Sequence, residues 1–244
     1  MEGEAKLLSK YLIKNLSKTY KKDNKEIMVL KNINLEIDAK DITVIIGKSG
    51  CGKTTFIRLL KGLEEYQSGE ILFKDDNDNY CEPKAAMVFQ ESRLMPWLNV
   101  KENILIHGKN EENLEKVLKL IKLSGLENAY PDELSGGMAN RVSIGRALIY
   151  DPDILIMDEP FAALDYFTRM DMQKEVIKIY EETKKGVIFV THNIEEAMLI
   201  ATKIIVLSKK NGVYEFSINK GFNRDIDEKY FIELKKEILN ILKE

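Results

Sequence analysis

The sequence predicts an α/β fold with a mostly parallel sheet, and three observations support this prediction. First, short and continuously apolar runs recur along the chain, as in strands buried on both faces of a parallel sheet; they are residues 42–46, 86–89, 154–157, 187–190 and 204–207. Second, segments with the apolar spacing of helices lie between several of these runs. Third, strands that alternate with helices are typical of an α/β core.

The remaining segments are predicted from their patterning. The first 40 residues predict short strands, and residues 33–37 (INLEI) alternate apolar and polar side chains like a half-buried strand. The polar run 74–80 (KDDNDNY) predicts a hairpin loop or a disordered tip. Residues 96–150 are rich in helical patterns without a clear strand, so we expect a helical insertion.

Two predicted helices have well-defined apolar faces. The first face comprises Leu114, Val117, Leu118 and Ile121. The second, near the C-terminus, comprises Phe231, Leu234, Ile238 and Leu242.

Composition restricts the class of protein. A chain of 244 residues is long enough for one large domain with a sizeable core. A net charge of -3 argues against a nucleic-acid partner, and two cysteines are too few for a disulfide framework, so we expect a reduced, cytosolic setting. No apolar run approaches the roughly 18 residues of a membrane helix, and the acidic N-terminus lacks the apolar core of a signal peptide.

A glycine-rich segment, GKSGCGKTT (47–55), follows the predicted strand 42–46 and opens a predicted helix. Its residues Gly47, Gly52, Lys53 and Thr54 match the phosphate-loop pattern G-x-x-x-x-G-K-[ST] in full. The glycines allow backbone N–H groups to surround phosphate oxygens, and the helix start adds positive potential. Lys53 is expected to bridge the β- and γ-phosphates, and the Thr54 hydroxyl to hold Mg²⁺.

A carboxylate pair, Asp158 and Glu159, ends the buried strand 154–157. Ligands of open α/β sheets gather at that end of the strands. We expect Asp158 to orient Mg²⁺ and Glu159 to polarise the attacking water in phosphoryl transfer.

The segment LSGGM (134–138) has two interpretations from its residues alone. It is either an ordinary helix start with Ser135 as the capping residue, or a second anion site without a lysine.

Together these elements resemble the nucleotide-binding subunits of ABC transporters over nearly the whole chain. The resemblance rests on GKSGCGKTT, Gln90 in VFQ, LSGGM, ILIMDEP, AALD (162–165) and His192 in VTHN. It implies one domain, residues 1–244, built on a P-loop NTPase core. Residues 1–95 and 151–244, with approximate limits, would form the core together with an N-terminal antiparallel β sub-domain. Residues of about 96–150 would form an inserted helical sub-domain.

The resemblance also implies how the second glycine motif works. Two copies pack head to tail, and the LSGG segment of each copy caps the ATP that is held by the other copy's lysine loop. Ser135 would donate its hydroxyl and Gly137 its backbone N–H to the γ-phosphate.

Site residues follow from the same resemblance. It implies catalytic roles for Glu159, His192 and Lys53, and Mg²⁺ ligation by Thr54, Gln90 and Asp158. It implies nucleotide contacts by Tyr20, Gly47, Lys48, Ser49, Gly50, Cys51, Gly52, Lys53, Thr54, Thr55, Gln90, Ser135, Gly136, Gly137 and Asp165. Tyr20 would either stack on the adenine ring or have only a packing role. If Gln90 does not bind Mg²⁺, it is simply a polar residue at the end of a strand. Asp165 resembles an aspartate of the family that contacts the second copy of the dimer.

One segment indicates the type of transporter. Residues 91–104 (ESRLMPWLNVKENI) resemble importers of the nitrate, sulfonate and taurine group, and Trp97 is either an exposed docking anchor or a core side chain. We expect a homodimeric motor on the cytoplasmic face of the membrane, acting on a permease fed by an extracytoplasmic solute-binding protein. The alternatives are the ATPase of an exporter or lipid-extraction complex, and a soluble ABC ATPase without a transport role. Asn140 and Gly145 depart from the family, which usually has glutamine and alanine there.

Overall fold

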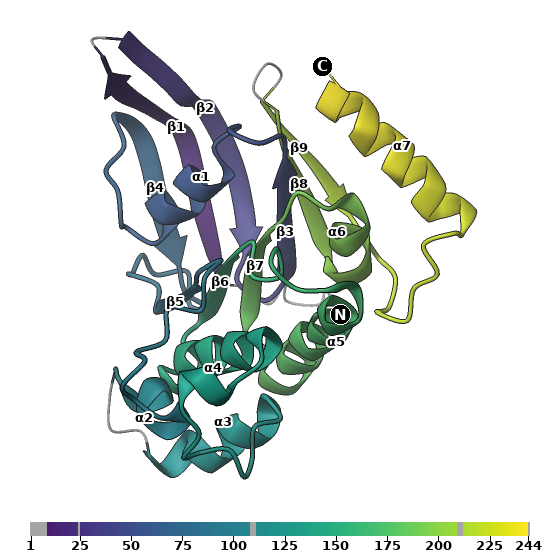
Figure 1. The fold of residues 1–244 in the computed structure, drawn as a ribbon. Coiled ribbons are helices and arrows are strands. Elements are labelled where there is room, and N and C mark those ends of the chain that lie inside the picture. Colours follow the sequence, from purple (N-terminus) through teal and green to yellow (C-terminus); the bar gives the residue numbers. More distant parts are fainter. Residues whose placement is uncertain (1–8, 24, 108–110, 209–211, 244) are drawn as a thin grey trace, which may run out of the picture. The chain divides into compact units, whose positions relative to one another are not determined.

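A computed structural model describes residues 9–23, 25–107, 111–208 and 212–243 of the chain (Figure 1). The N-terminal residues 1–8, on which the expected absence of a signal peptide rests, lie outside these ranges. The chain divides into two compact units. Unit 1 comprises Met1–Pro83 with Gly186–Glu244, and unit 2 comprises Lys84–Lys185.

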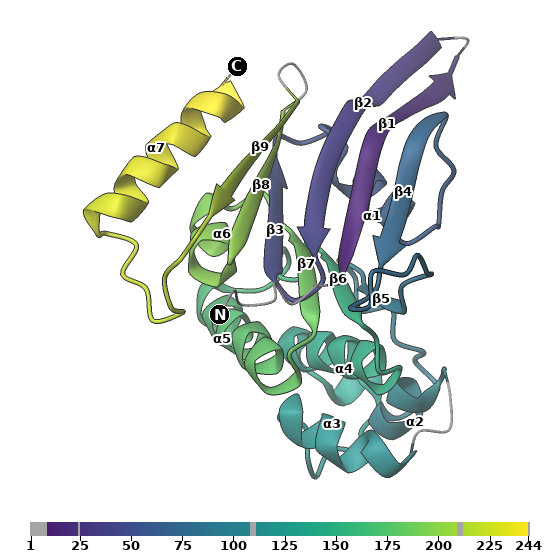
Figure 2. The same cartoon turned by 180° about the vertical axis from the view of Figure 1, so that it is seen from behind.

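Unit 1 contains a three-stranded antiparallel sheet, seen from both sides in Figures 1 and 2. Its strands are β1 (Lys10–Lys22), β2 (Lys25–Asp38) and β4 (Ser68–Lys74), in the order β2-β1-β4. β1 and β2 are longer than the short strands expected. Asn15 and Asn32 both have left-handed backbone conformations and lie near bulges in these strands. The bulges interrupt the alternation of apolar and polar side chains by which a long strand is recognised in a sequence.

Unit 1 also contains the parallel strands that carry the phosphate loop. These are β3 (Ile42–Gly47), β7 (Gly186–Val190) and β8 (Lys203–Ser208), and β9 (Gly212–Ser217) pairs with β8 in the antiparallel sense. Their order is β7-β3-β8-β9. Every residue of β3 and β7 is buried, as their continuous apolar runs predict.

The described residues of unit 1 also form three helices: α1 (Lys53–Leu60), α6 (Ile194–Ile200) and α7 (Lys229–Lys243). α7 packs against α6 and β8 and buries Phe231, Leu234 and Ile238. Leu242, predicted on the same face, is only half-buried, because it lies in the last turn of the helix. The polar run 74–80 forms the predicted hairpin loop, closed by a bridge between Lys74 and Tyr80.

Unit 2 combines one parallel strand pair with a group of helices. The strands are β5 (Ala85–Val88) and β6 (Ile154–Asp158). The helical elements are α2 (Val100–Leu105), η1 (Glu111–Asn113), α3 (Leu114–Leu120), η2 (Pro131–Glu133), α4 (Gly136–Ile149) and α5 (Tyr166–Thr183). Among the described residues between β5 and β6 there is no strand, so the predicted helical insertion is present.

The predicted fold class is confirmed. Strand pairing is parallel for β3 with β7 and β8 and for β5 with β6, an antiparallel sheet contains the N-terminal strands, and helices are inserted after β5. The predicted sub-domain limits near residues 95 and 150 differ from the limits of the compact units, which place β5, β6 and α5 with the inserted helices. Those sub-domain limits stay a prediction. None of the helices within the described ranges is long and apolar enough to cross a membrane.

Gly145, a departure from the family pattern, has a packing reason. A Cβ atom at this position would lie 2.6 Å from Cδ1 of Ile121 and 3.3 Å from Cδ1 of Ile104. The glycine therefore lets α4 approach α2 and the end of α3 closely, and Val117 packs at the same place.

A buried ion pair joins α4 to α5 within unit 2. The Glu175 side chain is only 1% exposed, and its Oε2 lies 2.8 Å from Nη2 of Arg141. The Nζ of Lys122, which is half exposed, lies 3.8 Å from the same oxygen. Burial raises the pKa of Glu175, and the neighbouring Arg141 opposes this rise. The ionised carboxylate therefore depends on Arg141.

We predict that Arg141→Leu lowers the free energy of unfolding by about 3 kcal/mol at pH 8, the cost of removing the closest cation from a buried carboxylate. The loss is smaller at pH 5, because the variant raises the pKa of Glu175 further and a protonated carboxyl needs no cation. Urea unfolding at both pH values measures the effect. The control Lys122→Ala removes the more distant, half-exposed cation and costs less than about 1 kcal/mol. An equal loss for Arg141→Leu at pH 5 and pH 8 contradicts this account.

Candidate functional site

The phosphate loop, residues 47–55, connects β3 to α1 in unit 1. Its fold requires glycine at two positions. A Cβ atom at Gly47 would lie 2.5 Å from Sγ of Cys51 and 2.6 Å from the carbonyl oxygen of Leu207. Gly52, the residue before α1, has a φ angle of 104°, a backbone conformation that residues with a Cβ atom rarely adopt. The sequence motif therefore encodes a backbone shape as well as a set of chemical groups.

Lys53 is the first residue of α1, and its ammonium group is held against the loop. The Nζ atom donates a hydrogen bond to the carbonyl oxygen of Gly47 at 3.0 Å, and the side chain is buried. The first turn of α1 contains no acidic residue. A buried cation, a helix N-terminus and neighbouring backbone amides thus combine at one place, which is the arrangement of a polyphosphate site.

His192 lies at the same edge of the parallel strands as the loop. β7 pairs with β3 in parallel, with Val190 opposite Ile45, and His192 follows Val190 by two residues. The side chain is exposed. Because the carboxyl ends of parallel strands meet at one edge, unit 1 brings His192 and the phosphate loop to that edge.

Unit 2 gathers three further predicted residues at one strand edge. Val88 of β5 pairs with Met157 of β6, so the carboxyl ends of the two strands lie side by side. Gln90 comes two residues after Val88, while Asp158 is the last residue of β6 and Glu159 follows it. Asp158 is buried, Glu159 half-buried and Gln90 exposed. Glu159 has a φ angle of 44°, an uncommon conformation for a residue other than glycine. Such backbone conformations cluster at functional sites, although several other non-glycine residues of this chain also have a positive φ angle.

The LSGGM segment begins α4. Ser135 is the N-cap residue, and its Oγ accepts a hydrogen bond from the backbone N–H of Met138 at 3.2 Å. The capping interpretation is therefore correct, but capping uses an oxygen lone pair and leaves the O–H as a donor. Ser135 and Gly136 are exposed. A Cβ atom at Gly137 would lie 2.7 Å from Cγ2 of Thr168, so this glycine permits close packing against α5.

Asp165 caps α5 in a similar way. Its carboxylate accepts hydrogen bonds from the backbone N–H of Thr168 at 3.1 Å and from the Thr168 hydroxyl at 2.6 Å. The hydroxyl contributes most to a lowered pKa of Asp165. Asp165 is exposed and remains ionised at neutral pH.

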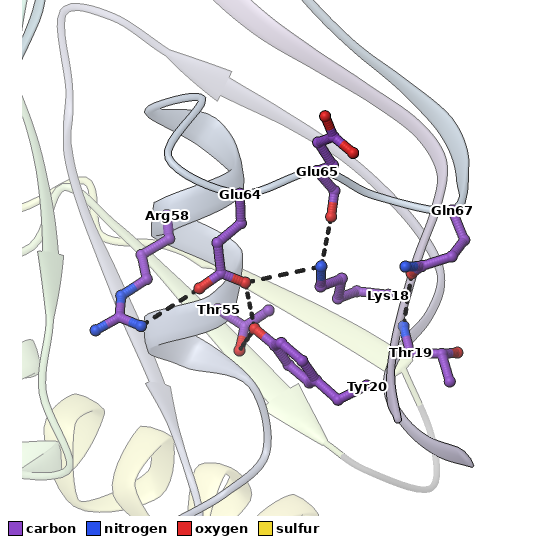
Figure 3. A network of polar contacts seen from close by, with 8 residues as sticks. All are labelled: Lys18, Thr19, Tyr20, Thr55, Arg58, Glu64, Glu65 and Gln67. Carbon is purple, nitrogen blue, oxygen red and sulfur yellow. Dashed lines mark hydrogen bonds and ion pairs between the residues drawn. The ribbon is translucent and has the colours of Figure 1, made fainter. Parts of the chain in front are cut away.

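Two residues that the sequence did not assign to the site take part in its geometry. The Asn140 side-chain amide donates to the carbonyl oxygen of Pro160 at 2.9 Å, which ties α4 to the residue that follows Glu159. In the sequence, only the departure of Asn140 from the glutamine that is usual in the family pointed to this position. Glu64 accepts a hydrogen bond from the Tyr20 hydroxyl, which also lies 3.3 Å from Oγ1 of Thr55 in the phosphate loop (Figure 3). No sequence pattern pointed to Glu64.

The predicted site residues thus form two groups. Unit 1 holds the phosphate loop, Tyr20 and His192, and unit 2 holds the remaining residues. Fold and site together define a nucleotide-binding protein of the P-loop class.

Comparisons with known proteins identify the family. The family described as "ABC transporter" matches residues 30–162. An aliphatic sulfonates import ATP-binding protein, SsuB of Bacillus cereus, is 39% identical over 234 residues, covering 93% of each chain. The taurine import ATP-binding protein TauB of Burkholderia thailandensis is 39% identical over 215 residues, covering 84% of this chain and 82% of that protein.

A solved structure supports the same family assignment. The ATP-binding cassette MJ0796, in a dimeric post-hydrolysis state bound to ADP and Pi, superposes with a TM-score of 0.72 at 32% identity. The superposition covers 86% of this chain and all of that one. The chain therefore belongs to the ABC transporter family and is an ATP-binding, ATP-hydrolysing subunit.

Proposed function

We propose that this protein is the ATPase subunit of an ABC importer for a small anion of the sulfonate, taurine or nitrate type. The observation that carries the proposal is the 39% identity to two import ATP-binding proteins over most of their length. The exporter and non-transport alternatives are not favoured by these relatives.

ATP binding starts from the phosphate loop. The backbone amides of residues 47–55 and the α1 N-terminus surround the phosphates, and Lys53 neutralises charge on the β- and γ-phosphates. Lys53 is suited to this because its amine is held at the loop by Gly47. Tyr20 stacks on the adenine ring.

Hydrolysis uses a further set of residues. Glu159 accepts a proton from the attacking water, and His192 contacts the γ-phosphate. Thr54, Gln90 and Asp158 would hold Mg²⁺, because hydroxyl, amide and carboxylate oxygens suit this ion and the paired strands bring Gln90 and Asp158 to one edge. When bound, the ion neutralises charge that develops on the phosphates.

A second copy of the chain completes each site. Ser135 and the α4 N-terminus of one copy cap the γ-phosphate of ATP bound to the other copy. The exposure of Ser135 and Gly136 supports this role, and the solved relative MJ0796 is dimeric. Asp165 lies at the contact between copies.

The permease contact is proposed for residues 91–99. Trp97 is 70% exposed, so the core-tryptophan interpretation is wrong. The segment around it is nevertheless fixed: the buried Asn103 side chain bonds to the backbone of Met95, Leu98 and Asn99. Arg146 also donates to the carbonyl oxygens of Ser92 and Arg93. An exposed tryptophan on a pre-ordered loop has the properties of a docking anchor.

This contact would place the protein on the cytoplasmic face of the membrane as a peripheral subunit. The permease would receive its substrate from an extracytoplasmic solute-binding protein.

We predict that Glu159→Gln retains ATP affinity but forms a stable dimer with ATP, because only water activation is lost. Size-exclusion chromatography with ATP and a phosphate-release assay measure both effects. The control Glu181→Gln removes the same charge from an exposed position on α5 and leaves turnover unchanged. Normal turnover of Glu159→Gln would exclude Glu159 as the base.

We predict that Trp97→Ala weakens association with the co-expressed permease subunits about tenfold or more, as expected for a truncated hot-spot residue. Co-purification in detergent measures the association, and the ATPase rate of the isolated subunit stays unchanged. The control Tyr150→Ala removes another exposed aromatic ring of unit 2, at 44% exposure, and leaves association intact. Equal retention of Trp97→Ala and wild type contradicts the proposed docking site.

A further inference from the structure

A polar network connects Tyr20 of β1 with α1 and the segment that follows it (Figure 3). We name it the base-side network and define it as Lys18, Tyr20, Thr55, Arg58 and Glu64. All five residues belong to unit 1, although Tyr20 and Glu64 are 44 positions apart in the sequence.

Glu64 is the centre of this network. One carboxylate oxygen, Oε2, accepts the hydrogen bond from the Tyr20 hydroxyl and lies 3.8 Å from Nζ of Lys18. The other oxygen, Oε1, lies 3.3 Å from Nη1 of Arg58. The Glu64 side chain is 21% exposed, so three groups from β1 and α1 meet on one largely buried carboxylate.

The network fixes the orientation of the Tyr20 ring. Its hydroxyl is held by Glu64 at one side and by Thr55 at the other. The Nζ of Lys18 lies over the ring, 4.8 Å from the centroid, and is itself held by the carbonyl oxygen of Glu65. With a cation over one face, the opposite face of this partly exposed ring is the one on which a flat ligand would stack.

The same contacts tie the ring to the phosphate loop. Thr55 belongs to the GKSGCGKTT segment and stands in the first turn of α1, and Arg58 lies one turn further along that helix. The distance between the ring and the loop is therefore set by side-chain contacts as well as by the backbone.

We propose that Glu64 is a positioning residue for nucleobase recognition, which holds the Tyr20 ring where it stacks on a base whose phosphates occupy the loop. The proposal rests on the proposed function, in which Tyr20 contacts adenine. Partial burial and the bond to Glu64 raise the pKa of Tyr20, so its hydroxyl stays protonated and can donate to Glu64 at neutral pH.

Equilibrium binding of ATP and of inorganic tripolyphosphate tests this role, because only ATP has a base. Glu64→Ala is expected to weaken ATP binding about tenfold, within the range measured for base–aromatic stacking. Tripolyphosphate binding stays unchanged, since the loop is intact. In steady-state assays KM for ATP rises and kcat does not change.

Three further variants sharpen the test. Glu64→Gln keeps an acceptor for the Tyr20 hydroxyl and restores most of the ATP affinity. Tyr20→Phe weakens ATP binding, and adding Glu64→Ala to it has little further effect, because both changes break one contact. The matched control Glu65→Gln removes a charge from the neighbouring exposed side chain and changes neither affinity.

The outcomes separate this proposal from the proposed function. Equal weakening of ATP and tripolyphosphate by Glu64→Ala would show that Glu64 supports the loop itself, and would overturn the positioning role. Additive losses in the double variant would also overturn it. If the wild-type protein bound neither ligand, the proposed function would fail as well.

Discussion

The shape of the phosphate loop is the constraint on which the other features depend. Gly47 and Gly52 allow a backbone that any Cβ atom would disturb, and this backbone brings Lys53 back onto the Gly47 carbonyl group. A buried ammonium beside a helix N-terminus gives a strong preference for a polyanion. The buried, β-branched strand β3 supports the loop from beneath, so the energy of core packing fixes the geometry of the binding groups.

Parallel strands explain why distant segments supply the chemistry. Each parallel strand ends at the same edge as its neighbour, so His192 follows the strand beside β3, and Gln90 follows the strand beside β6. Side chains at such an edge can be exchanged without changing the core. In unit 2 the caps of α4 and α5, together with the Asn140 bond to Pro160, connect the segments around Glu159 to the helices.

Much of the fold was predictable because burial on both faces leaves a clear signature, as in β3 and β7. The phosphate loop was predictable because its glycines are required by backbone shape. The full length of the bulged strands β1 and β2 was not predictable, since left-handed residues break their alternation. The roles of Glu64 and Glu175 depend on partners far away in the chain, and the exposure of Trp97 depends on a loop that Asn103 organises. Such tertiary contacts leave no periodic pattern in a single sequence.

The central claim is that each nucleotide is held by Lys53 of one copy and capped by Ser135 of the other. Mixing a Ser135→Arg subunit with a Lys53→Ala subunit tests it most directly, because each variant alone lacks one half of every site. The heterodimer contains one site with both halves intact. We predict that each variant alone is inactive and that the mixture regains ATP hydrolysis. A mixture that forms heterodimers but stays inactive would contradict the account.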